Sequence, residues 1–257
     1  MSTKTQEKPA TTEKPKATNG MPTMVAVDDG YATTKVAWID PGSGGIRLSS
    51  VPSTAKSGLH VTSVSSTRRS KSLGYRTGDE AYTVGPISDS EGTVFDAYPF
   101  STMNRAIIHH ALRMAGFAEQ DDHHVERLGL TLPFQRFYAD PAGVTQRRAA
   151  SLAEPVTAVI DEMPALTINA KGIEVYPEAT MAFLDQMYDE AGNASDPDDR
   201  GVAVVDIGGR TTDVMAMPHG NAEIDHSKSG TEDIGILSAV DTLSEKINQA
   251  FNVKYPP

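Results

Sequence analysis

Hydrophobic and polar positions divide the chain into short alternating runs and longer stretches of helical spacing. Runs rich in β-branched residues predict strands at residues 24–27, 33–39, 46–51, 125–132, 165–169, 173–176 and 202–205. Apolar residues that recur every three or four positions predict helices at residues 104–115, 144–153, 177–190 and 234–251. Strands in hairpins followed by helices occur twice, which indicates a mixed α/β protein with two related halves.

The helix predicted at residues 104–115 has the clearest pattern. Ser101 or Asn104 can cap its first turn with a side-chain oxygen. It carries two adjacent histidines, His109 and His110, whose side chains point about 100° apart on a helix. Because the two rings cannot chelate one metal ion together, we expect them to pack in the interior.

Two Asp-Gly turns, one in each half, share one sequence pattern. Asp28-Asp29-Gly30 and Asp206-Ile207-Gly208-Gly209 each follow a β-prone run and precede a threonine-rich run. Glycine lets a ligand approach the backbone, and successive amides in such a turn form a concave anion site. Two facing turns can clamp a polyphosphate, with Asp28 and Asp206 holding a hydrated divalent cation. Asp-Gly is also the commonest tight-turn signal between plain strands, so the repetition is what favours a functional site.

Composition narrows the class of protein. Of 257 residues, 39% are hydrophobic and 22% are charged, as in an ordinary globular protein. Acidic residues outnumber basic ones by 34 to 23, and the net charge of −11 disfavours direct nucleic-acid binding. The absence of cysteine excludes disulfides and thiolate metal sites and suits a reducing cytoplasm. No apolar run is long enough to span a membrane, so we expect a cytoplasmic protein.

Two polar stretches mark the predicted domain boundaries. Residues 1–23 are mainly Thr, Lys, Glu, Pro and Ala without an apolar core, so we expect a disordered tail. Residues 193–200 form the clearest polar break in the chain. The expected organisation is a first domain at 24–192, with a small inserted subdomain at about 47–99, followed by the start of a second, partial domain at 201–257.

At the two turns the chain resembles the superfamily of actin, heat-shock chaperone and sugar kinase ATPases. Within it, the closest resemblance is to the ParM/StbA group of plasmid-segregation actin-like proteins, from about Met24 to the end of the chain. The stretches that carry it are the two phosphate motifs Val27–Lys35 and Asp206–Asp213, the helix Asn104–Gly116, the strand end Thr131-Leu132-Pro133 and the Pro-Glu segment Val175–Ala179.

The resemblance implies an actin-like (ribonuclease H-like) duplicated fold, in which two α/β domains flank a cleft for ATP or GTP. Glu178 would position the attacking water, and Asp28 and Asp206 would act in catalysis while holding Mg²⁺ through its waters. Lys35 would reach the β- and γ-phosphate oxygens. The other nucleotide contacts would come from Asp29, Gly30, Thr33, Gly208, Gly209, Thr211 and Thr212. By its position alone, Glu178 is better explained as a first-turn acid favoured by the helix dipole.

Two departures from the family pattern change what we expect. Tyr31 and Ala32 stand where the group more often has small hydroxyl residues, so phosphate contacts there fall to the backbone. The Gly-Gly adenosine motif has no counterpart before Pro257, so we expect a truncated form with an incomplete second domain. We expect such a form to bind nucleotide weakly and to aggregate through residues such as Ile236 and Phe251 instead of forming regular filaments.

Three functions fit the resemblance. The first is a filament protein that polymerises with ATP or GTP, hydrolyses it and segregates plasmid DNA through a centromere-binding adaptor protein. The second is a sugar or small-molecule kinase, for which the sequence offers no distinctive sugar-binding signature. The third is a non-polymerising actin-like scaffold ATPase. We favour the first, because Pro177-Glu178 suits hydrolysis by water, and we expect no direct contact with nucleic acid or membrane.

Overall fold

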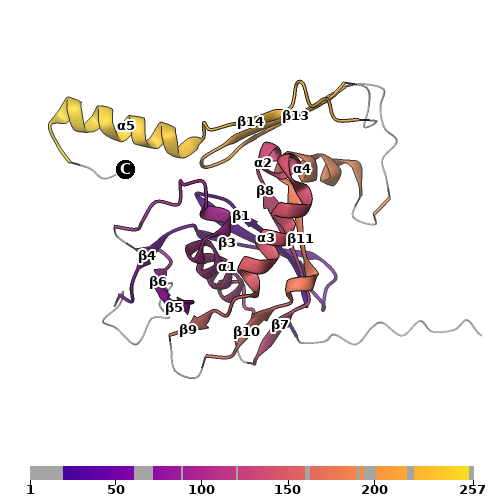
Figure 1. Ribbon diagram of the computed structural model, residues 1–257, viewed down its shortest axis with the longest axis vertical. Coiled ribbons are helices and arrows are strands. Elements are labelled where there is room, and N and C mark those ends of the chain that lie inside the picture. Colours follow the sequence, from indigo (N-terminus) through magenta and orange to yellow (C-terminus); the bar gives the residue numbers. More distant parts are fainter. Residues whose placement is uncertain are drawn as a thin grey trace, which may run out of the picture.

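The protein is described by a computed structural model that covers residues 20–60, 72–87, 89–119, 121–159, 163–189, 192–193, 201–218 and 223–254. Figure 1 shows a larger α/β body, with a second sheet and a long C-terminal helix lying across one end of it. The expected tail up to residue 19 and the expected break at 194–200 lie outside the described residues.

The larger body is built around a five-stranded sheet. Its strands lie in the order β11 (Ile173–Pro177), β8 (Arg127–Leu132), β1 (Met24–Asp29), β2 (Thr33–Ile39) and β3 (Ile46–Pro52). β11, β8 and β1 run parallel, whereas β2 and β3 are antiparallel to their neighbours. Because parallel strands end at the same edge, the carboxyl ends of β1, β8 and β11 meet there, and ligands bind at such edges in α/β sheets.

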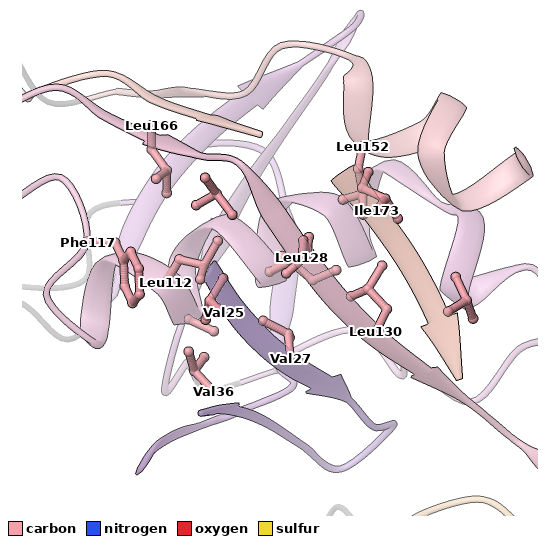
Figure 2. Packing of buried hydrophobic residues seen from close by; sticks show 14 of the residues in the cluster. Val25, Val27, Val36, Leu112, Phe117, Leu128, Leu130, Leu152, Leu166 and Ile173 are labelled. Atoms are coloured by element: carbon pink, nitrogen blue, oxygen red, sulfur yellow. The ribbon is translucent and has the colours of Figure 1, made fainter. Parts of the chain in front are cut away.

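Two helices cover one face of this sheet, α1 (Thr102–Met114) and α3 (Pro141–Ala153). Side chains alternate between the two faces of a strand, so Val25 and Val27 of β1 are buried while Met24 and Ala26 are exposed. Figure 2 shows the resulting core, in which Val27, Leu128 and Leu112 meet between sheet and helices. This core holds in place the edge of the sheet where the three parallel strands β1, β8 and β11 end.

A smaller sheet packs on the other side of α1. Its strands lie in the order β4 (Ala55–Ser57), β6 (Glu80–Val84), β5 (Leu73–Thr77) and β9 (Thr157–Ala158). A second core that includes Tyr75, Val84 and Ile107 joins it to α1 and to the short helix η1 (Tyr98–Phe100). β4, β5 and β6, from the range 47–99 expected to form an inserted subdomain, thus make a sheet with β9, from a later part of the chain, while β3 belongs to the large sheet.

The far end of the larger body carries a two-stranded parallel sheet of β7 (His123–Val125) and β10 (Leu166–Ile168), followed by η2 (Ala170–Gly172). Residues 20–23 lie beside it, although the sequence places them in the tail. Met21 packs against the first core, and the Thr23 carbonyl accepts the amide hydrogens of Glu126 and Arg127. No helix in the described ranges is long and apolar enough to cross a membrane.

The second unit consists of the antiparallel strands β12 (Val202–Ile207), β13 (Thr212–Met217) and β14 (Gly230–Glu232), followed by α5 (Ile236–Phe251). Its sheet packs on α2 (Phe134–Ala139) and α4 (Glu178–Met187). A third core of Phe134, Ala179, Phe183, Met215 and Met217 fills this junction. The two units are thus joined through α2 and α4, at the edge where β8 and β11 end.

Candidate functional site

Two hairpin turns meet tip to tip at the junction of the units. One joins β1 to β2, and the other joins β12 to β13. A Cβ atom on Gly209 would lie 2.8 Å from the backbone nitrogen of Ala32, so only glycine allows the turns to approach this closely. A pocket of about 260 Å³ lies between the turns and is lined by residues of both.

Three carboxylates from three elements line this pocket. Asp28 comes from the end of β1, Glu178 from the first residue of α4 and Asp206 from β12. Burial raises the pKa of Glu178 well above its ordinary value, and the charges of Asp28, Asp213 and Asp206 raise it further. Burial and the charge of Asp28 also raise the pKa of Asp206. The carboxylates repel one another, which is the arrangement a bound cation relieves.

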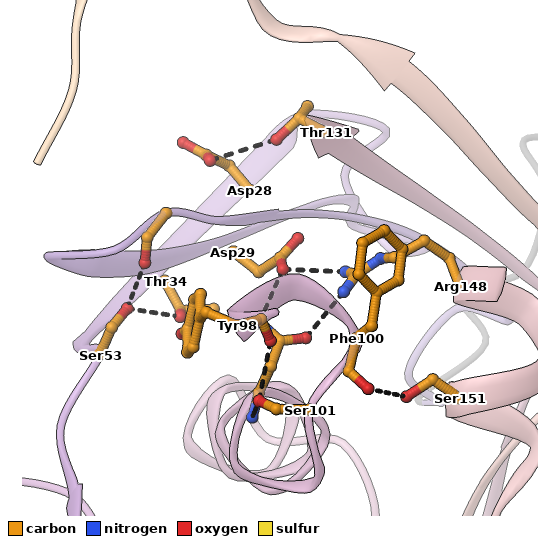
Figure 3. Close-up of polar contacts among 12 residues, drawn as sticks. Asp28, Asp29, Thr34, Ser53, Tyr98, Phe100, Ser101, Thr131, Arg148 and Ser151 are labelled. Atoms are coloured by element: carbon orange, nitrogen blue, oxygen red, sulfur yellow. Dashed lines mark hydrogen bonds and ion pairs between the residues drawn. The ribbon is translucent and has the colours of Figure 1, made fainter. Parts of the chain in front are cut away.

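Asp28 is held by two side chains of the sheet. Lys35, its partner in the hairpin register, donates to Asp28 Oδ2 at 2.7 Å. Thr131, from the end of β8, donates to Asp28 Oδ1 at 3.2 Å (Figure 3). The hydrogen bond to Asp28 raises the pKa of Lys35, so the pocket carries a firmly charged ammonium group.

The glycine and threonine residues of the prediction divide into those that line the pocket and those that do not. The lining ones are Gly30, Thr33, Gly208, Gly209 and Thr211. The Gly208 amide already donates to the Thr211 carbonyl within its turn at 2.8 Å. The Gly208 and Gly209 carbonyls accept the first amides of α5, from Ile236 and Leu237. The second turn is therefore braced by the helix that follows its sheet.

Asp29 and Thr212 are absent from the pocket lining. Thr212 donates to the Ile234 carbonyl at 2.6 Å. Asp29 follows Asp28 on the same strand and therefore points to the opposite face, into the core. There its Oδ2 atom accepts hydrogen bonds from Asn104 at 2.7 Å and from Arg148 at 2.8 Å (Figure 3). Asp29 therefore holds the first turn in place from the core side of the sheet.

The partners of Asp29 are buried with it. Arg148 of α3 is fully buried, and it also donates to Asn104 Oδ1 of α1 at 2.8 Å. The three side chains thus tie the end of β1 to both covering helices. Burial raises the pKa of Asp29, while the guanidinium of Arg148 opposes that shift.

Replacing Arg148 with methionine should destabilise the fold strongly. It would leave the Asp29 carboxylate buried without a cation, which costs about 3–5 kcal/mol. The neighbouring Arg147 offers a matched control, because it is exposed and pairs with Asp140 at 3.4 Å. Arg147→Met should change the free energy of unfolding by only about 0.5 kcal/mol. Equal urea midpoints for the two variants would contradict this account of Asp29.

Two polar residues of the second turn have roles that the sequence did not reveal. Asp213 is buried and accepts the Phe134 amide at 2.7 Å, so it caps the start of α2 across the junction. Arg210 contacts Asp96 and the ring of Tyr31. Phe134, Asp96 and Tyr31 all lie in the other unit, far away in sequence, so no local pattern could have identified these contacts.

The donors of the pocket suit a hydrated cation and a phosphate better than a directly bound metal ion. Within the described residues, no three His, Asp or Glu side chains gather closely enough to bind a metal directly. Asp28 and Asp206 do face one pocket with Lys35 and two glycine turns. Such a set suits Mg²⁺, which keeps several waters and is usually shared with substrate phosphates.

Comparison with known proteins identifies the family of the chain. The family described as plasmid segregation protein ParM, N-terminal, matches residues 23–188. No curated protein matches the chain in sequence.

Solved structures show the same fold. The archaeal actin homologue Ta0583 has a TM-score of 0.61 and 21% identity, over 91% of this chain and 68% of that one. A 15-stranded ParM filament from Clostridium botulinum has a TM-score of 0.66 and 14% identity, over 91% and 70%. The filament of AlfA from the B. subtilis plasmid pLS32 has a TM-score of 0.57 and 17% identity, over 90% and 80%. The fold is therefore actin-like, and the chain belongs to the family of the plasmid segregation protein ParM, matching its N-terminal domain.

Proposed function

We propose that this protein is a nucleotide-dependent actin-like filament protein that segregates plasmid DNA. In this proposal it polymerises with ATP or GTP, and hydrolysis of the nucleotide leads to disassembly. The observation that carries the proposal is the pocket in which Asp28, Glu178 and Asp206 face one another between two glycine turns. The family match and an ADP complex of the archaeal actin homologue support it.

The residues of the pocket suit attack by water on a terminal phosphate. Such reactions depend on positioning and on neutralising charge. Asp28 and Asp206 would hold the waters of Mg²⁺, which supplies charge neutralisation when bound. Lys35 would turn from Asp28 toward the phosphate oxygens as a point charge. Glu178, with its raised pKa, would accept a hydrogen bond from the attacking water and orient it.

The remaining nucleotide contacts follow from the two turns. Gly30, Gly209 and the hydroxyls of Thr33 and Thr211 would border the phosphates. Asp29 would support the first turn from the core side of the sheet, through its hydrogen bond with Arg148. We propose the domain organisation of the sequence analysis, with α2 and α4 as the elements that join the two units.

The partners in this proposal are other copies of the protein and a centromere-binding adaptor protein, in the cytoplasm. The filaments solved for ParM and AlfA support self-association. No direct contact with nucleic acid or membrane is part of the proposal.

Sedimentation with and without nucleotide tests this function. The chain is incubated with millimolar MgATP or MgGTP, and pellets are inspected by electron microscopy. The proposal predicts regular filaments only with nucleotide, whereas the aggregation expected in the sequence analysis would give irregular pellets with and without it. Nucleotide hydrolysis without any filament would favour a scaffold ATPase, and phosphorylation of added sugars would favour a kinase; either result would contradict the proposal.

A further inference from the structure

Arg210 lies at the contact between the two hairpin turns. It follows Gly209 in the second turn, and its side chain is 14% exposed. Its Nη2 atom donates to Asp96 Oδ1 at 2.6 Å, and its guanidinium carbon lies 5.4 Å from the ring centre of Tyr31. Both contacts are to the larger body, and Tyr31 belongs to the first hairpin turn.

Asp96 and Tyr31, the residues of the larger body that Arg210 contacts, are themselves held by several interactions. Arg136 of α2 donates to the Asp96 carbonyl at 2.7 Å and to the Tyr31 hydroxyl at 3.4 Å. The Tyr31 ring packs against Tyr98, with ring centres 5.2 Å apart. The carboxylate of Asp96 is exposed, and its pKa is lowered chiefly by Arg210. Arg210 therefore meets a residue whose backbone is held by Arg136 and an aromatic ring that packs on Tyr98.

A planar guanidinium suits this position better than an ammonium group. It can donate to a carboxylate while it stacks on an aromatic ring. Arg210 Nε also lies 3.5 Å from Asp233, which precedes α5, so the same side chain braces its own unit. One residue thus links the second turn to the first turn, to the loop around Asp96 and to the start of α5.

We propose that Arg210 is a positioning residue that latches the two hairpin turns together and sets the width of the pocket between them. Arg210 itself is absent from the pocket lining, whereas Tyr31 and Gly209 on either side of the latch belong to it. The latch sets how far Asp206 lies from Asp28. This inference rests on the proposed function only in that the pocket is taken to hold a nucleotide.

Spin-label distances test the latch without any nucleotide. The chain has no cysteine, so cysteines placed at the exposed Gln146 of α3 and Glu245 of α5 give one label pair across the two units. We expect a single narrow distance distribution, which Arg210→Met broadens and shifts. The control is Arg47→Met, which removes an exposed ion pair with Asp40 at 3.2 Å away from the pocket. A distribution in Arg210→Met that superimposes on that of Arg47→Met would overturn the proposal.

Nucleotide titration tests the consequence for the pocket. Arg210→Met and Asp96→Asn should each weaken Mg-nucleotide binding by about threefold to tenfold, and the double variant should be no weaker than Arg210→Met alone. Arg210→Lys should restore only part of the affinity, because an ammonium group loses the stacking. Effects of the two single changes that multiply in the double variant would overturn the coupling. If the unaltered chain binds no nucleotide, the proposed function fails, while the label distances still decide the latch.

Discussion

Replacing Glu178 with alanine should leave nucleotide binding nearly intact and slow hydrolysis by about 10²-fold to 10³-fold. Glu178 is the first residue of α4 and lies at the edge of the pocket, where burial and the charges of four aspartates raise its pKa. A carboxylate with a raised pKa is a better proton acceptor for an attacking water near neutral pH. Single-turnover phosphate release measures the rate, and filaments that persist because their nucleotide is not hydrolysed would be the structural counterpart.

Glu174 provides the matched control for this change. It lies four residues earlier, on β11, outside the pocket lining, and it pairs with Arg127 at 2.8 Å. Glu174→Ala should hydrolyse nucleotide at the rate of the unaltered chain. Equal rates for Glu178→Ala and Glu174→Ala would remove Glu178 from the catalytic role.

Replacing Asp206 with alanine should abolish Mg²⁺-dependent nucleotide binding. With one of the two facing carboxylates gone, the hydrated cation loses half of its protein partners. We expect the affinity to fall by about 100-fold, or ~3 kcal/mol. Calorimetric titration of MgATP and MgGTP, with and without EDTA, measures this change.

The melting temperature shows whether that loss is a folding defect. The pKa of Asp206 is raised, so its ionised form is disfavoured in the folded state, and at neutral pH the carboxylate reduces stability. Asp206→Ala without ligand should therefore melt at the same or a higher temperature than the unaltered chain. Asp241→Ala, an exposed position on α5, is the control that should bind normally. Unchanged affinity in Asp206→Ala would exclude Asp206 from the site.

The strands and long helices of this chain could be predicted because their patterns are local. β2 spans the predicted Thr33–Ile39, and β1 extends the predicted run only to Asp29. Helix α3 starts three residues before the prediction, because Asp140 caps it by accepting the Gly143 amide at 3.0 Å. The six-residue helix α2 is too short to show a helical period.

The small sheet was harder to predict than the large one. No strand was predicted for the stretch that forms β5 and β6, and β9 joins them from beyond α3. Pairing between distant segments is set by which faces need burial, here the second side of α1. A single sequence shows the need for a partner layer without showing which segment supplies it.

In the candidate site, too, local sequence patterns could predict some features, whereas others required the structure. The repeated Asp-Gly pattern predicted that Asp28 and Asp206 lie close together, and the structure places both in the lining of one pocket. Strand alternation already implied that Asp28 and Asp29 face opposite sides, and this signal could have excluded Asp29 from the pocket. Its partner Arg148 is 119 residues away, so the anchor itself required the structure. The same holds for Arg210 and Asp96, which are 114 residues apart.

Amide chemical shifts test the central claim most directly, namely that the two turns together hold the phosphates of a magnesium nucleotide. The chain is labelled with ¹⁵N and titrated with MgATP or MgGTP. The account predicts that the largest shifts fall on both turns, around Gly30 and around Gly209, and that the amides near Arg47 on β3 stay unchanged. Shifts confined to one turn, or located at the far end of the sheet around β7 and β10, would contradict it.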